Sequence, residues 1–236
     1  MKEPIFKSYL NSNAGIINPV KGSGFINSSS QNYDTGVYSG VQAMYKGTGL
    51  AAANADGINY TFNPVGTLEL WIKLDGWSCT GTSVSDGANH YILEYFGSQN
   101  VPELTLIYFA SGQGVHFDLT DTGGYRRVTI ASETWPADTW IFIAWVWDYN
   151  ETTEKIRIYK GDYGSSVSKV GTGGSMTNFG SGVSRDMALG QRGDPGAGLS
   201  GFKGWLAGLT IYDFAKTDFS DRYNLRSGMN DLIVCG

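Results

Sequence analysis

The chain has 236 residues and a formal net charge of −5, and only 17% of its residues are charged. Glycine accounts for 33 residues and aromatic side chains for 14%, a profile typical of many short strands joined by tight turns. The sequence has no basic cluster to attract nucleic acid or an anionic membrane, and no stretch reaches the roughly 18 apolar residues of a membrane span. We therefore expect one all-β domain that binds no nucleic acid and inserts into no membrane.

The first residues lack the apolar run of a secretory signal peptide. Localisation therefore stays open, and a virion surface and an extracellular setting both fit the sequence. The two cysteines, Cys79 and Cys235, are too few for a disulfide framework or a metal knuckle. Free thiols are their expected state.

Residues 1–50 alternate short apolar groups with glycine, serine and asparagine. They predict two or three weak strands that belong to the same unit as the main sandwich, residues 51–236. The first residues, to about position 20, are expected to form an arm. This arm would either cross the sandwich or reach a neighbouring chain.

The strand pattern sharpens from Thr67, where aliphatic residues alternate with other residues over 67–74 and predict a half-buried strand. Residues 111–114 are expected to join a hairpin through a four-residue loop, and residues 161–184 to form a mobile loop with at most one strand. Further strands are expected over residues 91–96, 103–109, 115–119, 127–131, 154–160, 187–190 and 206–214.

Residues 140–148, WIFIAWVWD, are rich in tryptophan and β-branched side chains, which favours a fully buried central strand. Alternate side chains of a strand point to opposite faces. One face would carry Ile141, Ile143, Trp145 and Trp147, and the other Trp140, Phe142, Ala144 and Val146. We expect one face to lie in the sandwich core and the other to be covered by loops, a partner or a ligand.

Residues 217–221, TDFSD, indicate an N-cap and the first turn of a short helix to about Arg226, the one helix expected. About a dozen strands in one domain predict a two-sheet antiparallel β-sandwich, aligned or of the jelly-roll kind.

Three segments resemble strands of the laminin-G-like and concanavalin A-like jelly rolls: Leu70–Asp75, Trp140–Asp148, and Phe202–Ala215 followed by the Thr217 cap. The resemblance covers roughly residues 56–226. It implies two curved antiparallel sheets and, usually, non-catalytic recognition of glycans or proteins, often with one calcium ion at the rim. Where the family has an Asp-Glu pair in the final strand this chain has Ala207-Gly208, so properties that need those carboxylates are not implied.

Catalytic residue sets are absent from the sequence. Hydrolysis of a glycosidic bond needs two carboxylates about 5 to 9 Å apart, and no acid pair occurs at strand spacing. The stretch Tyr159–Tyr163 resembles the Tyr-x-Lys-x-Gly-x-Tyr strand of jelly-roll alginate lyases but is one residue short. Gln113–His116 is one residue too long for the lyase Gln-x-His element, and residues 126–129 lack the acid of its arginine strand. We assign no catalytic residue.

Calcium requires several oxygen ligands that converge from loops. The candidates are Asp56, Asn59, Asp186 and Asp194, and no contiguous calcium loop occurs. No cofactor is assigned, and calcium is the metal that the resemblance allows.

Sugars are bound by flat aromatic faces and by polar side chains, so aromatic residues in loops are the candidate contacts. The predicted ligand-binding residues are Trp77, Tyr125, Trp135, Tyr149, Tyr163, Arg192 and Asp194. The sequence thus predicts a non-enzymatic, lectin-like module that binds a glycan or polysaccharide. The alternatives are a subunit of a larger assembly such as a viral capsid or fibre, pairing with itself or with other subunits, and a polysaccharide lyase.

Overall fold

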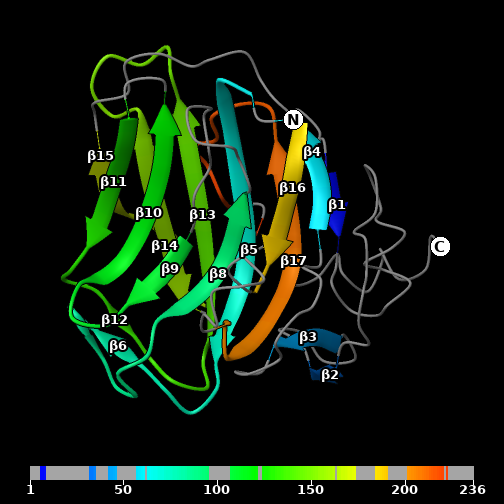
Figure 1. The fold of residues 1–236 in the computed structure, drawn as a ribbon, viewed down its shortest axis with the longest axis vertical. Helices are drawn as coiled ribbons and strands as arrows, with labels where there is room; N and C mark the ends of the chain where they lie inside the picture. Colours follow the sequence, from blue (N-terminus) through cyan, green and yellow to red (C-terminus); the bar gives the residue numbers. More distant parts are fainter. Residues whose placement is uncertain are drawn as a thin grey trace.

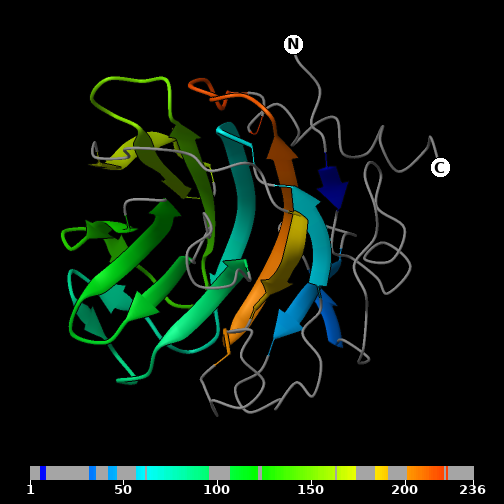
Figure 2. The same cartoon turned by 45° about the horizontal axis from the view of Figure 1, so that its top comes forward.

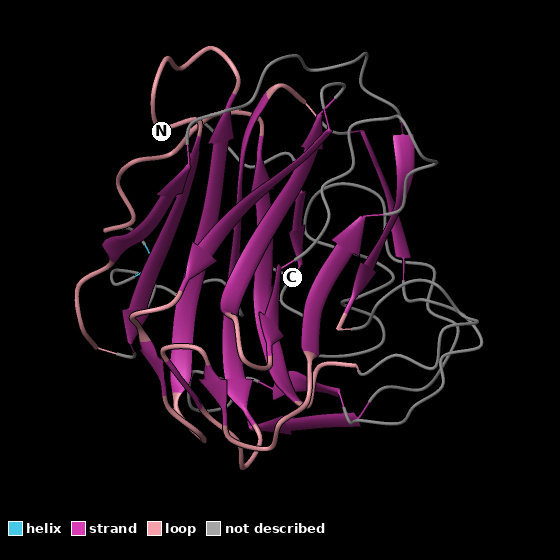
Figure 3. Ribbon diagram, turned by 60° about the vertical axis from the view of Figure 1, so that its left-hand side comes forward, coloured by secondary structure: helices cyan, strands magenta, loops and turns pink. Residues whose placement is uncertain are grey.

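The computed structural model describes residues 6–8, 32–35, 42–46, 57–61, 63–95, 107–121, 124–162, 164–173, 184–190, 201–220 and 222. Strands dominate these residues (Figure 3). The strands form two large sheets and one small one, with antiparallel pairing between neighbours. The predicted all-β, two-sheet sandwich is confirmed. No helix among the described residues has the length and apolar character needed to cross a membrane.

The larger sheet contains eight strands in the order β15-β14-β13-β5-β17-β3-β2, with β1 paired to β17. Their bounds are β1 (Phe6–Ser8), β2 (Asn32–Thr35), β3 (Gln42–Lys46), β5 (Val65–Leu74), β13 (Trp140–Asp148), β14 (Ile156–Asp162), β15 (Ser168–Gly173) and β17 (Gly204–Tyr212). Three of these strands come from the first fifty residues, as predicted. Because β1 pairs with β17 of its own chain, this part of the arm lies along the sandwich.

The second sheet contains six strands in the order β11-β10-β9-β8-β16-β4 and lies in front of β13, β5 and β17 in Figure 1. Its strands are β4 (Gly57–Thr61), β8 (His90–Tyr95), β9 (Ile107–Ala110), β10 (Gly114–Asp121), β11 (Gly124–Ile130) and β16 (Ser184–Leu189). Short strands β6 (Cys79–Thr80), β7 (Ser83–Val84) and β12 (Thr134–Trp135) make the small third sheet. Both large sheets curve in Figure 2.

The tryptophan-rich strand is β13, which lies between β14 and β5 in the larger sheet. Its side chains alternate as predicted between two separate apolar clusters. Ile141, Ile143, Trp145 and Trp147 belong to the core between the sheets, and Phe142, Ala144 and Val146 belong to a cluster on the outer face. Each fully buried aromatic or aliphatic side chain of this kind contributes about 1.5–3 kcal/mol to folding.

The prediction that β5 is half buried is wrong. Its second face carries Thr67, Glu69 and Trp71, and these side chains are at most 5% exposed. The reason is that residues 213–220 and 222, here named the C-terminal strap, cover this face after β17 ends.

Several local predictions are corrected by the register. Gly114 pairs with Ala110, so the β9–β10 hairpin has a three-residue loop, not four. In contrast, the prediction of at most one strand within residues 161–184 agrees with the described residues, in which β15 pairs with β14. At the predicted helix start, the carboxylate of Asp218 rather than the Thr217 hydroxyl accepts the capping hydrogen bond, from Ser220 N at 2.9 Å. The helix predicted beyond residue 222 lies outside the described residues.

Candidate functional site

The C-terminal strap is fixed to the outer face of the larger sheet by a buried ion cluster. The Glu69 carboxylate, in the middle of β5, has no exposed surface. It accepts hydrogen bonds from Lys216 Nζ at 2.7 Å and Arg222 Nε at 2.8 Å. Because an uncompensated buried charge is strongly destabilising, this cluster fixes the strap to β5 at two points, Lys216 and Arg222.

Further contacts tie the strap to β5 and β17. The Thr67 hydroxyl donates to the carbonyl oxygen of Phe214 at 2.8 Å and accepts from the Lys216 backbone amide at 2.9 Å. Arg222 also donates to the Thr210 hydroxyl at 2.9 Å. The strap is therefore a defined part of the fold and can present side chains with fixed geometry.

Phe219 is the apolar anchor of the strap. It is 4% exposed, and its ring lies 4.7 Å from the ring of Tyr159 and 5.9 Å from that of Phe142, measured between centroids. The ring of Tyr159 is closer to Phe219 than that of Phe142 is, and the Phe219 and Tyr159 rings meet at an interplanar angle of 50°. They form the apolar floor of a pocket on the outside of the larger sheet.

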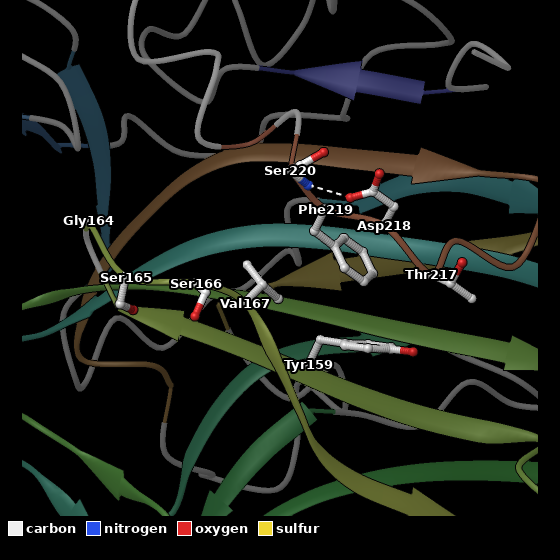
Figure 4. A pocket seen from close by; sticks show the side chains of 9 residues that line it. All are labelled: Tyr159, Gly164, Ser165, Ser166, Val167, Thr217, Asp218, Phe219 and Ser220. Carbon is white, nitrogen blue, oxygen red and sulfur yellow. Dashed lines mark hydrogen bonds between the residues drawn. The ribbon is translucent and has the colours of Figure 1, made fainter.

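This pocket has a volume of about 560 Å³, within the range of about 300–1,000 Å³ common for ligand sites. Its walls are the strap and the turn between β14 and β15 (Figure 4). In Figure 4 the Phe219 ring points toward Val167 and Tyr159, with the turn serines on one side and Thr217 on the other. The lining residues are Tyr159, Gly164, Ser165, Ser166, Val167, Thr217, Asp218, Phe219 and Ser220.

The turn that makes one wall is held by its own hydrogen bonds. Ser165 N donates to the carbonyl oxygen of Asp162 at 3.0 Å, and the Ser165 hydroxyl accepts from Asp162 N at 2.9 Å. Gly164 has a φ of +93°, a conformation that favours glycine because other residues are strained there. The pocket wall is thus encoded locally by the Gly-Ser sequence.

The polar groups of the pocket are hydroxyls and one carboxylate. Ser165, Ser166, Thr217 and Ser220 are exposed, and so is Asp218. Hydrogen bonds from the backbone amide and hydroxyl of Ser220 lower the pKa of Asp218, which is therefore ionised at neutral pH. The pocket can accept hydrogen bonds from the hydroxyl groups of a ligand. The carbon face of the ligand can pack on the ring of Tyr159.

A second cluster of polar side chains lies on the face of the six-stranded sheet that points away from the core. Tyr91, Tyr108, His116 and Thr129 are direct neighbours across β8, β9, β10 and β11. Arg127 binds the Asp118 carboxylate through Nε at 2.8 Å and Nη2 at 3.0 Å, and Nη2 also donates to the Tyr108 hydroxyl at 2.8 Å. The rings of Tyr91 and Tyr108 stack at 5.0 Å.

His116 is the most unusual member of this face, since it is only 2% exposed. Its Nδ1 lies 3.1 Å from the Thr129 hydroxyl, while Nε2 has no hydrogen-bond partner. Burial, with a smaller effect of the Arg127 charge, lowers the pKa of His116 to about 4. The imidazole is therefore neutral at pH 7.

The structure contradicts the prediction that Trp77 and Trp135 contact a ligand. Trp77 is 1% exposed and Trp135 0%, so neither ring can meet a ligand while the core stays closed. Trp77 donates its indole hydrogen to the Lys203 carbonyl oxygen at 2.6 Å and stacks on His90. Trp77 lies in the connection between β5 and β6 and Trp135 in strand β12, and both side chains belong to the core between the sheets.

The remaining predicted contacts are not brought together by the described residues. Tyr149 is partly buried against the core, outside the pocket. Tyr125 belongs to β11, opposite Thr120. Tyr163, Arg192 and Asp194 lie outside the described residues.

For calcium, the register places Asn59 of β4 opposite Asp186 of β16. Asp56 and Asp194 lie outside the described residues. In the part of the chain that the structure describes, no three His, Cys, Asp or Glu side chains gather as metal ligands. Cys79 is a free thiol, as expected.

The sequence does not mark the pocket residues as a site. Its local patterns predict a helix start at Thr217–Ser220 and, around Tyr159, a motif similar to a lyase strand. The alternation of Ile156, Ile158 and Lys160 places Tyr159 on the opposite face from the core, so strand periodicity contained a signal for it. Nothing local showed that the strap folds back over that face.

No protein-family model matches the sequence, and a search of curated proteins by sequence finds no match. Solved structures do match the fold. Domain 4 of AbnA, a GH43 extracellular arabinanase from Geobacillus stearothermophilus solved with arabinotriose, superposes with a TM-score of 0.54 at 12% identity, over 91% of this chain and 94% of that domain. A PL-14 alginate lyase from Aplysia kurodai gives a TM-score of 0.52 at 10% identity, over 89% and 99%.

The receptor-binding domain of botulinum neurotoxin type G gives a TM-score of 0.53 at 11% identity, over 95% of this chain and 52% of that one. At these identities the likeness concerns the fold, a β-sandwich consistent with the concanavalin A-like kind.

Proposed function

We propose that this chain is a glycan-binding module that holds a saccharide without transforming it, and that the pocket between the β14–β15 turn and the strap is its binding site. The observation that carries the proposal is the composition of that pocket. A partly exposed tyrosine ring on strand β14 stands beside exposed hydroxyls and one ionised carboxylate. Sugar recognition combines such ring faces with a few placed polar groups.

The comparisons support this proposal by analogy of fold. The arabinanase domain was solved with arabinotriose, and the toxin domain is described as receptor-binding. Fold likeness alone does not carry function between unrelated sequences, so the pocket has to supply the argument for this chain.

The binding-only part of the proposal rests on the acids of the pocket. Hydrolysis of a glycosidic bond uses two carboxylates that flank the bond. Asp218 is the single carboxylate among the described lining residues. We therefore expect a bound oligosaccharide to be recovered intact.

The test is binding to a panel of immobilised oligosaccharides and affinity electrophoresis in polysaccharide gels, each with and without calcium. We expect the wild type to bind at least one glycan, and Tyr159→Ala to bind it about tenfold more weakly, equivalent to about 1.4 kcal/mol. Tyr149→Ala, which removes a tyrosine outside the pocket, is the matched control and should retain affinity. No binding to any glycan, with or without calcium, would exclude the proposal.

A polysaccharide lyase is the second candidate, because Tyr108, His116 and Arg127 gather on the six-stranded sheet. A neutral imidazole and a phenol are suitable groups for proton transfer, and a guanidinium can bind a carboxylate. His116 is only 2% exposed and Arg127 is paired with Asp118, so this activity would require the surface of the sheet to open and Arg127 to leave Asp118. Incubation with alginate would test this candidate through the ultraviolet absorbance of an unsaturated product. Activity that disappears in both Tyr108→Phe and His116→Gln would replace the binding proposal with an enzymatic one.

A further inference from the structure

Charge is distributed unevenly around the pocket. Asp218 is ionised and exposed at its edge, and none of its nine described lining residues is lysine, arginine or histidine. The pocket therefore offers a ligand anion no opposite charge from its own lining.

The two cations of the strap do not change this balance. Lys216 and Arg222 both turn their charged groups toward Glu69, and their side chains are 10% and 7% exposed. Lys169 of the neighbouring strand β15 is paired with Glu154, with Nζ–O distances of 2.6 Å to both carboxylate oxygens. Each of these cations is paired with a carboxylate. The charge of Lys216 also contributes to lowering the pKa of Asp218, but Asp218 is the one charged residue among the described lining residues.

We propose that the pocket is selective for neutral sugars and that Asp218 is the residue that excludes acidic ones, such as uronates, sialates and sulfated sugars. This inference rests on the proposed glycan-binding function and assigns the class of glycan. Hydroxyl groups of a neutral sugar donate charge-assisted hydrogen bonds to the carboxylate. A carboxylate or sulfate at the same position meets a like charge, which disfavours binding.

The geometry of Asp218 allows its charge to be removed without dismantling the turn. One oxygen, Oδ1, accepts the hydrogen bond from Ser220 N at 2.9 Å. An asparagine side chain has a carbonyl oxygen that can accept the same bond. Asp218→Asn therefore isolates the effect of charge on ligand choice.

The experiment measures binding to matched pairs of neutral and acidic oligosaccharides, for example galacto-oligosaccharides against oligogalacturonates, and lactose against sialyllactose. We expect the wild type to bind members of the neutral series and none of the acidic series at the same concentration. Asp218→Asn should gain at least about tenfold in affinity for the acidic partner and should keep neutral binding within about threefold.

Asp138→Asn is the matched control. It also turns one exposed aspartate into asparagine, whose carbonyl oxygen can keep the hydrogen bond that Asp138 accepts from Gly76 N at 3.2 Å. Asp138 lies between β12 and β13 and does not line the pocket, so this variant should keep wild-type selectivity.

The outcomes separate the two proposals. Tyr159-dependent binding of acidic sugars by the wild type, or an unchanged preference in Asp218→Asn, would overturn the inference and leave glycan binding intact. Binding that does not depend on Tyr159 would also overturn it, since the pocket would not be the site. Failure to bind any member of either series would overturn both.

Discussion

Glu69 is a carboxylate with no exposed surface, held between the ammonium group of Lys216 and the guanidinium group of Arg222. In the sequence it is an isolated acid on an alternating strand. In the fold it joins two residues that follow it by 147 and 153 positions. Its role is to fix the strap that forms one wall of the pocket.

We predict that Glu69→Gln lowers the free energy of unfolding by about 3–5 kcal/mol, because it leaves two buried cations without a counter-charge. Glu154→Gln removes an exposed carboxylate paired with Lys169 and should change stability by less than about 1 kcal/mol. Urea unfolding followed by tryptophan fluorescence measures both. Equal midpoints for the two variants would show that the buried cluster does not stabilise the fold.

We predict that the buried His116 side chain makes the free energy of unfolding depend on pH. Its folded pKa of about 4 lies below the unfolded value of about 6.5, so between these values the unfolded state binds more protons. Stability is therefore fully retained above about pH 6.5 and falls as the pH drops toward 4. From pH 7.5 to 4.5 the wild type should lose about 2–3 kcal/mol more than His116→Gln, as measured by urea unfolding at each pH. Parallel pH profiles would contradict a buried, neutral imidazole.

At the scale of single elements, the first residue of strand β17, Gly204, is tightly packed against strand β5. Gly204 has a φ of +157°, and a Cβ placed there would overlap the Lys73 carbonyl oxygen of the adjacent strand β5. The absence of a side chain at this position lets β17 pair with β5, which in turn brings the strap over the outer face.

We predict that Gly204→Ala lowers the free energy of unfolding by about 3 kcal/mol, through backbone strain and overlap. Gly76→Ala is the control, since Gly76 also has a positive φ, +67°, but open space around it; it should lose only about 1 kcal/mol. Urea unfolding compares the two. A Gly204→Ala protein as stable as the control would mean that the strand pair tolerates the methyl group.

At the scale of the whole molecule, one continuous core joins the two large sheets and the small third sheet. Cys79 lies within it, fully buried, and burial raises the pKa of its thiol to about 11. Since the thiolate is the reactive form, this residue reports on opening of the core.

We predict that in a Cys235→Ser background a thiol reagent at pH 8 labels Cys79 only as fast as the molecule unfolds. The labelled fraction should follow the urea unfolding curve recorded by fluorescence. Rapid labelling of Cys79 in buffer without urea would contradict this prediction. It would show that the core opens locally near β6.

Sequence periodicity determined most of the sandwich by itself. The alternation in residues 140–148 divided the side chains of β13 into the two sets that the structure places on opposite faces, because side-chain direction in a strand depends only on position parity. It did not show which set faces the core. The run of short strands also determined the fold class. Side-chain alternation and the spacing of short strands are local properties. They can therefore be predicted without knowledge of the tertiary contacts.

Tertiary structure alone decided the site. The sequence places Trp77 and Trp135 in predicted loops, where side chains are commonly exposed, but the structure buries both rings in the core, and Trp135 belongs to strand β12. Tyr159 became a pocket wall because the strap, held to Glu69 from about 150 residues away, returns across the outer face of the larger sheet. Contacts between segments so distant in sequence depend on the register of intervening strands, and periodicity within one segment carries no information about them.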